Sequence, residues 1–134
     1  MWNVITFVGE ENGFQMNETE KLLDSIIAGI REKKGSRIAT VDLSGIDDTV
    51  CGHFVICQAD TANQLLAIED SIEDIVRTDA GLKPFMVEGM RFAHWIAMDY
   101  GEVMVHLFLP ELRRFYDLEH LWADAVIVEL PDGD

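Results

Sequence analysis

The stretch that decides the fold is Trp95-Ile96-Ala97-Met98-Asp99-Tyr100-Gly101-Glu102-Val103-Met104-Val105-His106. Two apolar runs flank Tyr100-Gly101, and this pattern predicts a β-hairpin with those two residues as its turn. In that register Trp95 lies opposite His106, and Asp99 lies opposite Glu102. Side chains alternate between the two faces of a strand, so one face of the hairpin is wholly aliphatic and is predicted to be buried. That face carries Ile96, Met98, Val103 and Val105.

The other face of the predicted hairpin mixes an aromatic ring, a thioether, an imidazole and two acids. It carries Trp95, Ala97, Asp99, Glu102, Met104 and His106. Asp99 and Glu102 would be like charges directly across the hairpin, which costs about 0.2–1 kcal/mol, and a partner's Lys or Arg would offset that cost. Trp is also favoured at the centres of protein interfaces. Two interpretations stay open: the face binds a basic protein, or a helix of the same domain covers it, as is usual in α/β folds.

Two longer helices are predicted before the hairpin. Asn17 and Glu20 have the spacing of a capping box, apolar residues then recur at helical spacing, and Gly35 supplies a stop. Thr61 or Asp60 caps the second helix, which carries an apolar stripe from residue 65 to residue 76 and is closed by Gly81.

The remaining segments indicate strands and short helical turns. Strands are predicted at 37–42, 54–57 and 84–88, with 54–57 as a buried central strand, and 43–50 is a polar connection. A short helix starts at Pro110 and runs through Phe115, and 118–122 continues as a helix or 3-10 turn. The order of elements predicts an α/β fold with a mixed β-sheet flanked by helices.

The length of 134 residues fits one domain. We place it at residues 17–125, with residues 126–134 as an acidic C-terminal tail. Residues 1–16 do not fit the rest of the pattern. They are either a lineage-specific arm or the product of an over-extended start.

The net charge of −15 comes from 25 acidic residues against 10 Lys and Arg. Proteins draw most of their affinity for nucleic acids from Lys and Arg that neutralise phosphates, so we expect no direct nucleic-acid binding. A basic protein partner is favoured instead. The alternative is that the charge serves only solubility.

Other composition features point to a cytoplasmic protein. No apolar run reaches about 18 residues, so we expect no membrane span. Residues 1–5 lack the basic start of a secretory signal. Cys51 and Cys57 are the two cysteines, and their place in one apolar segment suits a reducing compartment better than a disulfide.

Several segments together resemble the ribosomal silencing factor family, RsfS, also called Iojap-related. They are Glu88-Gly89, the hairpin stretch, Arg113-Arg114-Phe115-Tyr116-Asp117-Leu118-Glu119, and Leu121-Trp122-Ala123-Asp124. The resemblance covers roughly residues 20–125 and is specific because many residues fall at fixed spacings. One segment departs from the family: Gly52-His53 stands where the usual pattern has Asp-Tyr, which puts any role of those two positions in doubt.

The resemblance implies a small adaptor that binds the large ribosomal subunit and stops the small subunit from joining it. It implies contact with a subunit-interface ribosomal protein, uL-fourteen, repression of translation under nutrient limitation, a homodimer in the free state, and a sheet related to the nucleotidyltransferase core. The partner-contact candidates that it implies are Trp95, Asp99, Tyr100, Gly101, Glu102, Met104 and His106. Tyr116, Leu118 and Trp122 also match the family, and we interpret them as packing in the core. A factor that assembles the large subunit would bind the same place.

Catalytic and metal-binding alternatives are weaker, and we expect no catalytic, cofactor or metal site. A nucleotidyltransferase needs carboxylates that converge on metal; here Gly35-Ser36 and Asp42 are present, but residue 44 is Ser and Asp47-Asp48 are adjacent. Cys51, His53 and Cys57 would share one face of a strand, but the two cysteines would lie about 20 Å apart along it. Neither a Gly-x-Ser-x-Gly motif nor a Gly-rich phosphate loop occurs.

Overall fold

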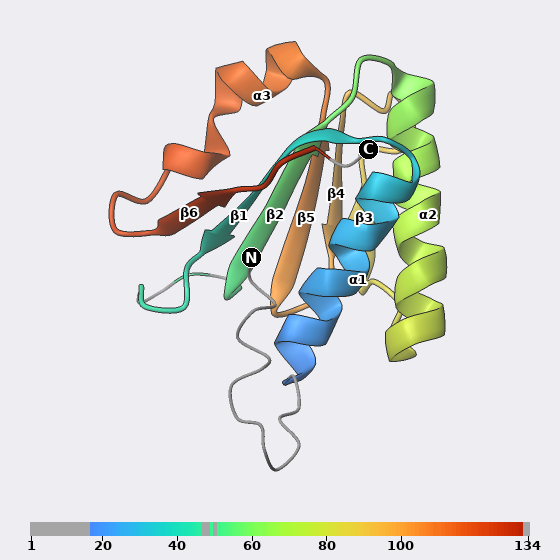
Figure 1. Cartoon of the computed structure of the whole chain (residues 1–134). Helices are drawn as coiled ribbons and strands as arrows, with labels where there is room; N and C mark the ends of the chain where they lie inside the picture. The colour runs from blue at the N-terminus through green and yellow to red at the C-terminus, as the bar shows by residue number, and fades with distance from the viewer. Residues whose placement is uncertain (1–16, 47–48, 50, 133–134) are drawn as a thin grey trace.

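Six strands form one mixed sheet in the order β3-β4-β5-β2-β1-β6 (Figure 1). The computed structural model describes residues 17–46, 49 and 51–132, so the expectation for residues 1–16 and the pair Asp47-Asp48 lie outside the described residues. The strands are β1 (Ser36–Asp42), β2 (His53–Gln58), β3 (Met86–Glu88), β4 (Trp95–Asp99), β5 (Val103–Phe108) and β6 (Val126–Glu129). The central pair β2 and β5 is parallel and the other pairs are antiparallel, which confirms the predicted mixed α/β sheet.

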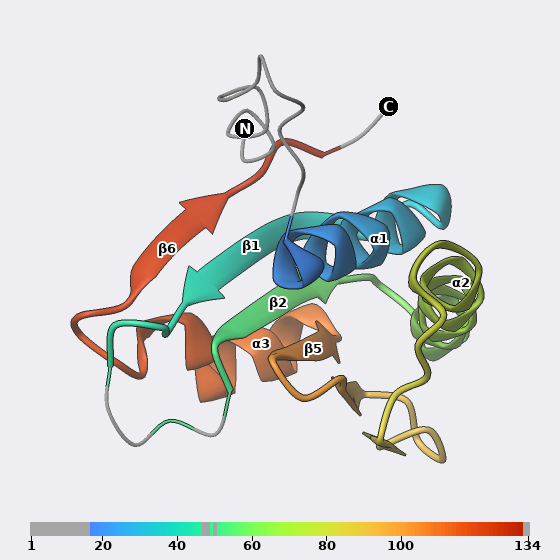
Figure 2. The same cartoon turned by 90° about the horizontal axis from the view of Figure 1, so that it is seen from below.

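Helices cover both faces of the sheet. Helices α1 (Glu18–Glu32) and α2 (Ala62–Ala80) lie side by side on one face, and α3 (Pro110–Tyr116) with the 3-10 helix η3 (Leu118–His120) lies on the other (Figures 1 and 2). The predicted caps are present: Asn17 and Glu20 form a reciprocal capping box, and the Thr61 side chain caps α2. These local hydrogen bonds determine where each helix starts.

The two long helices pack closely because Gly29 of α1 has no side chain. A Cβ at Gly29 would lie 2.8 Å from the Cα of Ile72 in α2. The Ser71 hydroxyl donates a hydrogen bond of 2.9 Å to the Gly29 carbonyl, so the contact is also polar. Beneath α1 and α2 lies the larger core cluster, which includes the aliphatic face of the hairpin. A smaller cluster built around Phe54 and Phe108 lies on the α3 face.

The hairpin register differs from the predicted one by two residues. Trp95 pairs with Phe108 and Asp99 pairs with Met104, so the turn residues are Gly101 and Glu102 rather than Tyr100 and Gly101. Gly101 has a φ of 91°, which suits the first central position of a hairpin turn of type II′. The Asp99 carboxylate accepts a hydrogen bond of 2.8 Å from the Gly101 amide and supports this turn. A shift of two leaves every side chain on its predicted face, and the aliphatic face is buried as expected.

Both edges of the sheet also differ from the prediction. The third strand is shorter than 84–88 and begins at Met86. The segment 126–134, which we predicted to be a tail, contributes β6, in which Ile127 pairs with Val41 of β1. Ile127 faces the smaller core cluster, while Val126 and Val128 are exposed. Because these exposed positions are also apolar, the sequence of β6 lacks the alternation of apolar and polar residues that identifies a strand. No helix in the described part of the chain is long and apolar enough to cross a membrane.

Candidate functional site

Aromatic rings gather on the α3 face of the sheet, at the end where β4 begins. The aromatic cluster consists of Phe54, Trp95, His106, Phe108, Phe115, Tyr116 and Trp122. Trp95 stacks on Phe108 with a centroid distance of 5.0 Å and meets Tyr116 of α3 at 4.7 Å. Such contacts contribute about 0.5–1.5 kcal/mol each beyond the area they bury. The indole is therefore held rigidly by its own protein.

Trp95 also makes a polar contact inside the cluster. Its Nε1 donates a hydrogen bond of 3.0 Å to Nδ1 of His106, which is itself buried. Burial lowers the pKa of His106 to about 4, so the imidazole is neutral at pH 7 and its Nδ1 is free to accept. The indole orientation therefore depends on a neutral histidine.

One side of the cluster remains open to solvent, and we call it the aromatic patch: Trp95, Phe115 and Tyr116. Phe115 is 77% exposed and Tyr116 is 45% exposed, while Trp95 is half-buried. The start of α3 is tied to β4 because the Leu109 amide donates to the His94 carbonyl at 2.9 Å. This tie places the exposed rings of α3 beside the indole.

The predicted contact residues fall into two groups. Trp95, Met104 and His106 belong to the α3 face, where Met104 is half-buried and His106 is buried. Asp99, Gly101 and Glu102 stand at the hairpin turn, at the far end of β4, about 13 Å from Trp95 at about 3.3 Å per residue. Glu102 is exposed there.

Two expectations about the turn were wrong. Asp99 does not face Glu102 across the hairpin, because the turn is shifted and Asp99 pairs with Met104. Tyr100 is buried in the core cluster beneath α1 and α2, so its side chain lies on the opposite side of the sheet from the aromatic patch. The supposed repulsion that a partner's cation would offset is therefore absent from this register.

The α3 face is partly covered by the protein's own helices, as one of the two interpretations predicted. Leu118 and Trp122 pack against the smaller core cluster, which confirms their predicted packing role. The same prediction was wrong for Tyr116, which contacts Trp95 but remains substantially exposed. The cover reaches Trp95 through Tyr116 but is incomplete there, so the indole stays partly exposed.

Sequence reasoning missed Phe115 as a site residue. Tyr116 stands three residues after the buried Arg113 and lies on the inward side of α3, whereas Phe115 stands two residues after Arg113 and points away. The sequence alone left this open, because Phe115 and Tyr116 follow Leu112 by three and four residues and either could face inward.

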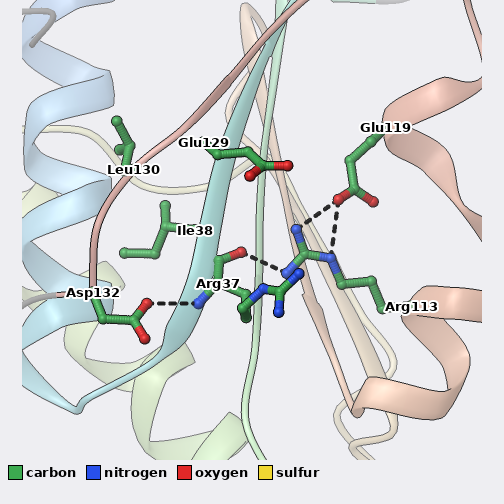
Figure 3. Close-up of a pocket in the computed structure, with 7 residues that line it drawn as sticks. All are labelled: Arg37, Ile38, Arg113, Glu119, Glu129, Leu130 and Asp132. Carbon is green, nitrogen blue, oxygen red and sulfur yellow. Dashed lines mark hydrogen bonds and ion pairs between the residues drawn. The ribbon is translucent and has the colours of Figure 1, made fainter.

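Arg113 is a second residue that sequence reasoning missed. Its buried guanidinium donates to Glu119 from Nε at 3.1 Å and from Nη2 at 2.6 Å (Figure 3). Nη1 donates to the Gln58 side chain at 3.2 Å and to the Arg37 carbonyl. This network ties α3 and η3 to the ends of β1 and β2, and so it positions the aromatic patch. The sequence carried no signal for it, because each partner is distant in the chain except Glu119.

Comparison with known proteins bears directly on these elements. The model of the family "Ribosomal silencing factor during starvation" matches residues 16–134, which include every described strand and helix. The chain belongs to this family.

Individual silencing factors match over most of the chain. The ribosomal silencing factor of Bacillus subtilis is 33% identical over 118 residues, which cover 88% of this chain and 98% of that protein. The one from Halalkalibacterium halodurans is 31% identical over 111 residues, covering 83% and 93%. The chloroplastic protein Iojap of Zea mays is 37% identical over 81 residues, covering 58% of this chain and 33% of that protein.

Solved structures show the same fold. A crystal structure of a Chromobacterium violaceum protein has a TM-score of 0.74 at 28% identity and covers 81% of this chain and 88% of that one. A Bacillus halodurans structure has a TM-score of 0.70 at 29% identity, covering 83% and 99%. The silencing-factor family and the mixed α/β sheet predicted from sequence are both confirmed.

Gly52, one of the two positions expected from sequence to depart from the family pattern, lies beside the hairpin turn. A Cβ at Gly52 would lie 2.9 Å from Oε1 of Glu102, so a larger residue there would have to displace this carboxylate. An Asp at this position would also place two like charges together. Nε2 of His53 lies 3.7 Å from Oδ1 of Asp42.

Asp42 is engaged locally. Its Oδ1 accepts from the Ser44 hydroxyl at 2.6 Å and from the Ser44 amide at 2.9 Å. Partial burial raises the pKa of Asp42, but these bonds and the nearby His53 outweigh burial and hold the pKa below its usual value. Within residues 17–46, 49 and 51–132, no group of three or more His, Cys, Asp or Glu could hold a metal ion. Cys51 and Cys57 are both free and buried.

Proposed function

We propose that this silencing-factor family member binds the large ribosomal subunit through the aromatic patch and sterically prevents the small subunit from joining. The contact that we propose is with uL-fourteen, a basic ribosomal protein at the subunit interface. Translation would be repressed as a result. The observation that carries the proposal is Trp95, which its own protein holds in one orientation and yet leaves partly exposed beside two exposed rings.

The chemistry of the patch supports a protein partner. Clustered exposed aromatic side chains are uncommon on a surface that has no partner. Trp and Tyr are enriched among the residues that carry most of the binding energy of interfaces, because they combine large apolar area with a polar group. A rigidly held indole also loses little side-chain entropy on binding, which favours affinity.

The charge of the chain supports a basic partner. A net charge of −15 attracts a cationic protein over a range set by salt, which speeds encounter and orients approach. Asp99 and Glu102 at the hairpin turn, together with Gly101, would extend the contact away from the aromatic patch. We place the protein in the cytoplasm, where ribosomes work, and propose no direct contact with nucleic acid.

A steric mechanism breaks no bond, so it requires no nucleophile, general acid, metal or cofactor, and we propose that the protein is not an enzyme. A factor that assembles the large subunit would use the same surface. It would associate with precursor particles rather than with mature subunits, and this difference separates the two roles.

We also propose that the free protein forms a homodimer. The segment around edge strand β3 exposes several large apolar side chains, and association would remove them from water. These side chains are Leu82, Phe85, Met86, Met90 and Phe92. Light scattering coupled to size-exclusion chromatography, with Phe85→Ala as the disrupting variant, tests the dimer; a monomer at every concentration contradicts it.

Co-sedimentation with separated ribosomal subunits tests the main proposal. The wild type is expected to sediment with the large subunit and to reduce the yield of joined ribosomes when small subunits are added. Trp95→Ala and Phe115→Ala are each expected to weaken binding at least about tenfold, the loss typical of an interface hot spot. Val128→Ala is the matched control and should bind normally, because Val128 is an exposed apolar residue of β6, the edge strand at the other side of the sheet from β3 and β4.

Two outcomes would overturn the proposal: normal large-subunit binding by correctly folded Trp95→Ala, or binding without any effect on subunit joining. Circular dichroism and urea unfolding establish that each variant is folded. The enzymatic alternative has its own test, since it requires metal-dependent nucleotide turnover that Asp42→Asn abolishes.

A further inference from the structure

The three residues that follow β6 are held by hydrogen bonds to other elements, and we call residues 130–132 the strap. The Leu130 amide donates to the Ile38 carbonyl of β1 at 2.8 Å. The Pro131 carbonyl accepts from Nη2 of Arg31, in the last turn of α1, at 2.9 Å. The strap is thus attached both to the sheet and to a helix that covers it.

The last bond of the strap is made to a residue with an unusual backbone. Oδ1 of Asp132 accepts from the Arg37 amide at 2.9 Å (Figure 3). Arg37 has a φ of 54°, in the left-handed region that residues with a Cβ rarely adopt. The register of β1 against β2 shifts between Ser36 and Ala39, so Arg37 lies within a β-bulge. Such a strained conformation persists only where its surroundings hold it.

The other backbone group of Arg37 is held from the opposite direction. Its carbonyl accepts from Nη1 of Arg113, whose Nε and Nη2 bind Glu119 (Figure 3). The left-handed residue is therefore bound through its amide by the strap and through its carbonyl by α3. These bonds form one series from the strap to α3, the helix that carries the exposed rings of the aromatic patch.

We infer that Asp132 is a positioning residue for the aromatic patch, acting through Arg37 and Arg113. Without the Asp132 oxygen, Arg37 loses a bond that compensates its left-handed conformation and relaxes toward ordinary strand geometry. The Arg37 carbonyl then turns away from Arg113, and α3 loses one of its attachments to β1. This inference rests on the proposed function and adds to it a residue that lies outside the patch.

Asp132 can leave Arg37 without disrupting the core. Asp132 is exposed, and a hollow of about 270 Å³ lies between the strap and the Arg113 network (Figure 3). Leu130, by contrast, packs against the larger core cluster and anchors the start of the strap. Loss of the Asp132 bond should therefore change the position of α3 while leaving the global free energy of unfolding nearly unchanged.

Two substitutions separate the hydrogen bond from the charge. Asp132→Ala removes both the acceptor oxygen and the charge, whereas Asp132→Asn removes the charge and keeps an acceptor at Oδ1. Asp124→Ala is the matched control, because Asp124 is an exposed acid that lies shortly before β6. Circular dichroism and urea unfolding should show that all three variants are folded and about as stable as the wild type.

The first measurement is made by NMR on the full chain without ribosomes. Hydrogen exchange of the Arg113 Nε–H, which is bonded to Glu119 at 3.1 Å, should be at least about fivefold faster in Asp132→Ala. The indole resonance of Trp95, assigned by comparison with Trp95→Phe, should shift in the same variant. Asp132→Asn and Asp124→Ala should resemble the wild type in both respects. Unchanged exchange and indole resonance in Asp132→Ala overturn the inference, and so do equal changes in Asp132→Asn.

The second measurement is affinity for the large ribosomal subunit by co-sedimentation. Asp132→Ala should weaken binding roughly three- to tenfold, and Asp132→Asn should bind normally. Normal binding by Asp132→Ala despite faster exchange overturns the positioning role. A wild type that does not sediment with the large subunit overturns the proposed function instead, and the NMR measurement then decides the inference alone.

A third variant tests the left-handed residue itself. Glycine adopts positive φ without strain, so Arg37→Gly should keep the bulge without help from Asp132. In that background Asp132→Ala should change the Arg113 exchange rate by less than about twofold. A full effect of Asp132→Ala in the glycine background would overturn the role of the left-handed peptide.

Discussion

The indole Nε1 of Trp95 and Nδ1 of His106 lie 3.0 Å apart, as diagonal neighbours on adjacent strands of one face. The bond exists only while the imidazole is neutral, because a protonated histidine has no acceptor nitrogen. The partly exposed ring that we propose as the centre of the binding surface is therefore oriented by a buried, uncharged group beneath it. Stability and orientation of the aromatic patch both depend on this pair.

Acid should destabilise the protein through His106. Its pKa is about 4 in the folded state against 6.5 in the unfolded state, so the unfolded chain takes up the proton first as pH falls. Stability from this residue is intact above pH 6.5 and is lost as pH falls toward 4, by up to about 1.4 kcal/mol per unit. Urea unfolding at several pH values measures the slope. His106→Asn, whose Oδ1 can still accept from Trp95, should show a shallower slope; identical slopes contradict the assignment.

Trp95→Phe should separate the polar contribution of the indole from its packing. The phenyl ring can still stack on Phe108, but Nδ1 of His106 loses its donor while remaining buried, and we expect the free energy of unfolding to fall by about 1–2 kcal/mol. A double-mutant cycle with His106→Leu, which removes the acceptor, isolates the pair. Strict additivity of the two changes would mean that the hydrogen bond contributes nothing.

Arg113→Ala should be strongly destabilising, although arginine is a residue usually found at protein surfaces. The change leaves the mostly buried Glu119 carboxylate without its cation, and removing one partner of a buried pair costs about 3–5 kcal/mol. Arg114→Ala, at the exposed neighbouring position, should stay within about 0.5 kcal/mol of the wild type. Chemical denaturation compares the two, and equal effects would show that the network in Figure 3 is not stabilising.

Gly89→Ala should disrupt the loop that leads into β4. Gly89 has a φ of 92°, and a Cβ there would lie 2.0 Å from the carbonyl oxygen of Trp95. Gly81→Ala is the control, because Gly81 also has a positive φ, of 70°, but open space around it. We expect about 1 kcal/mol of destabilisation at Gly81 from backbone strain alone. The loss in free energy of unfolding for Gly89→Ala should be at least about 3 kcal/mol. Equal losses for the two variants would mean that backbone strain, and not the clash with the Trp95 carbonyl, causes the whole effect.

Features set by neighbouring residues were predictable. The capping box of Asn17 and Glu20 and the cap at Thr61 stand where predicted, because each cap is a hydrogen bond across three residues. The faces of the hairpin strands were also correct, since alternation depends only on parity. The hairpin register was predicted wrongly. Either Tyr100-Gly101 or Gly101-Glu102 could form the turn, and the choice depends on whether Gly101, with its positive φ, occupies the first or the second turn position.

The binding surface was only partly predictable. Trp95 was among the predicted contact residues, but Tyr100, predicted as a turn residue, is buried before the turn, and Phe115 was overlooked. Which of these side chains is exposed depends on how much of the sheet α3 covers. The position of α3 is fixed by the hydrogen bonds of Arg113 to residues of β1 and β2. Strand β6 was missed for a related reason, since its four residues are stable only as an addition to the edge of β1.

The amino-acid sequence by itself determined the family, the two capped helices and the two-faced hairpin, because these follow from interactions between residues a few positions apart and from fixed spacings. Tertiary structure decided the hairpin register, the sixth strand, the exposure of Trp95 beside Phe115 and Tyr116, and the burial of Tyr100. Each of these depends on atoms from distant segments competing for the same space, and local sequence carries no information about that competition.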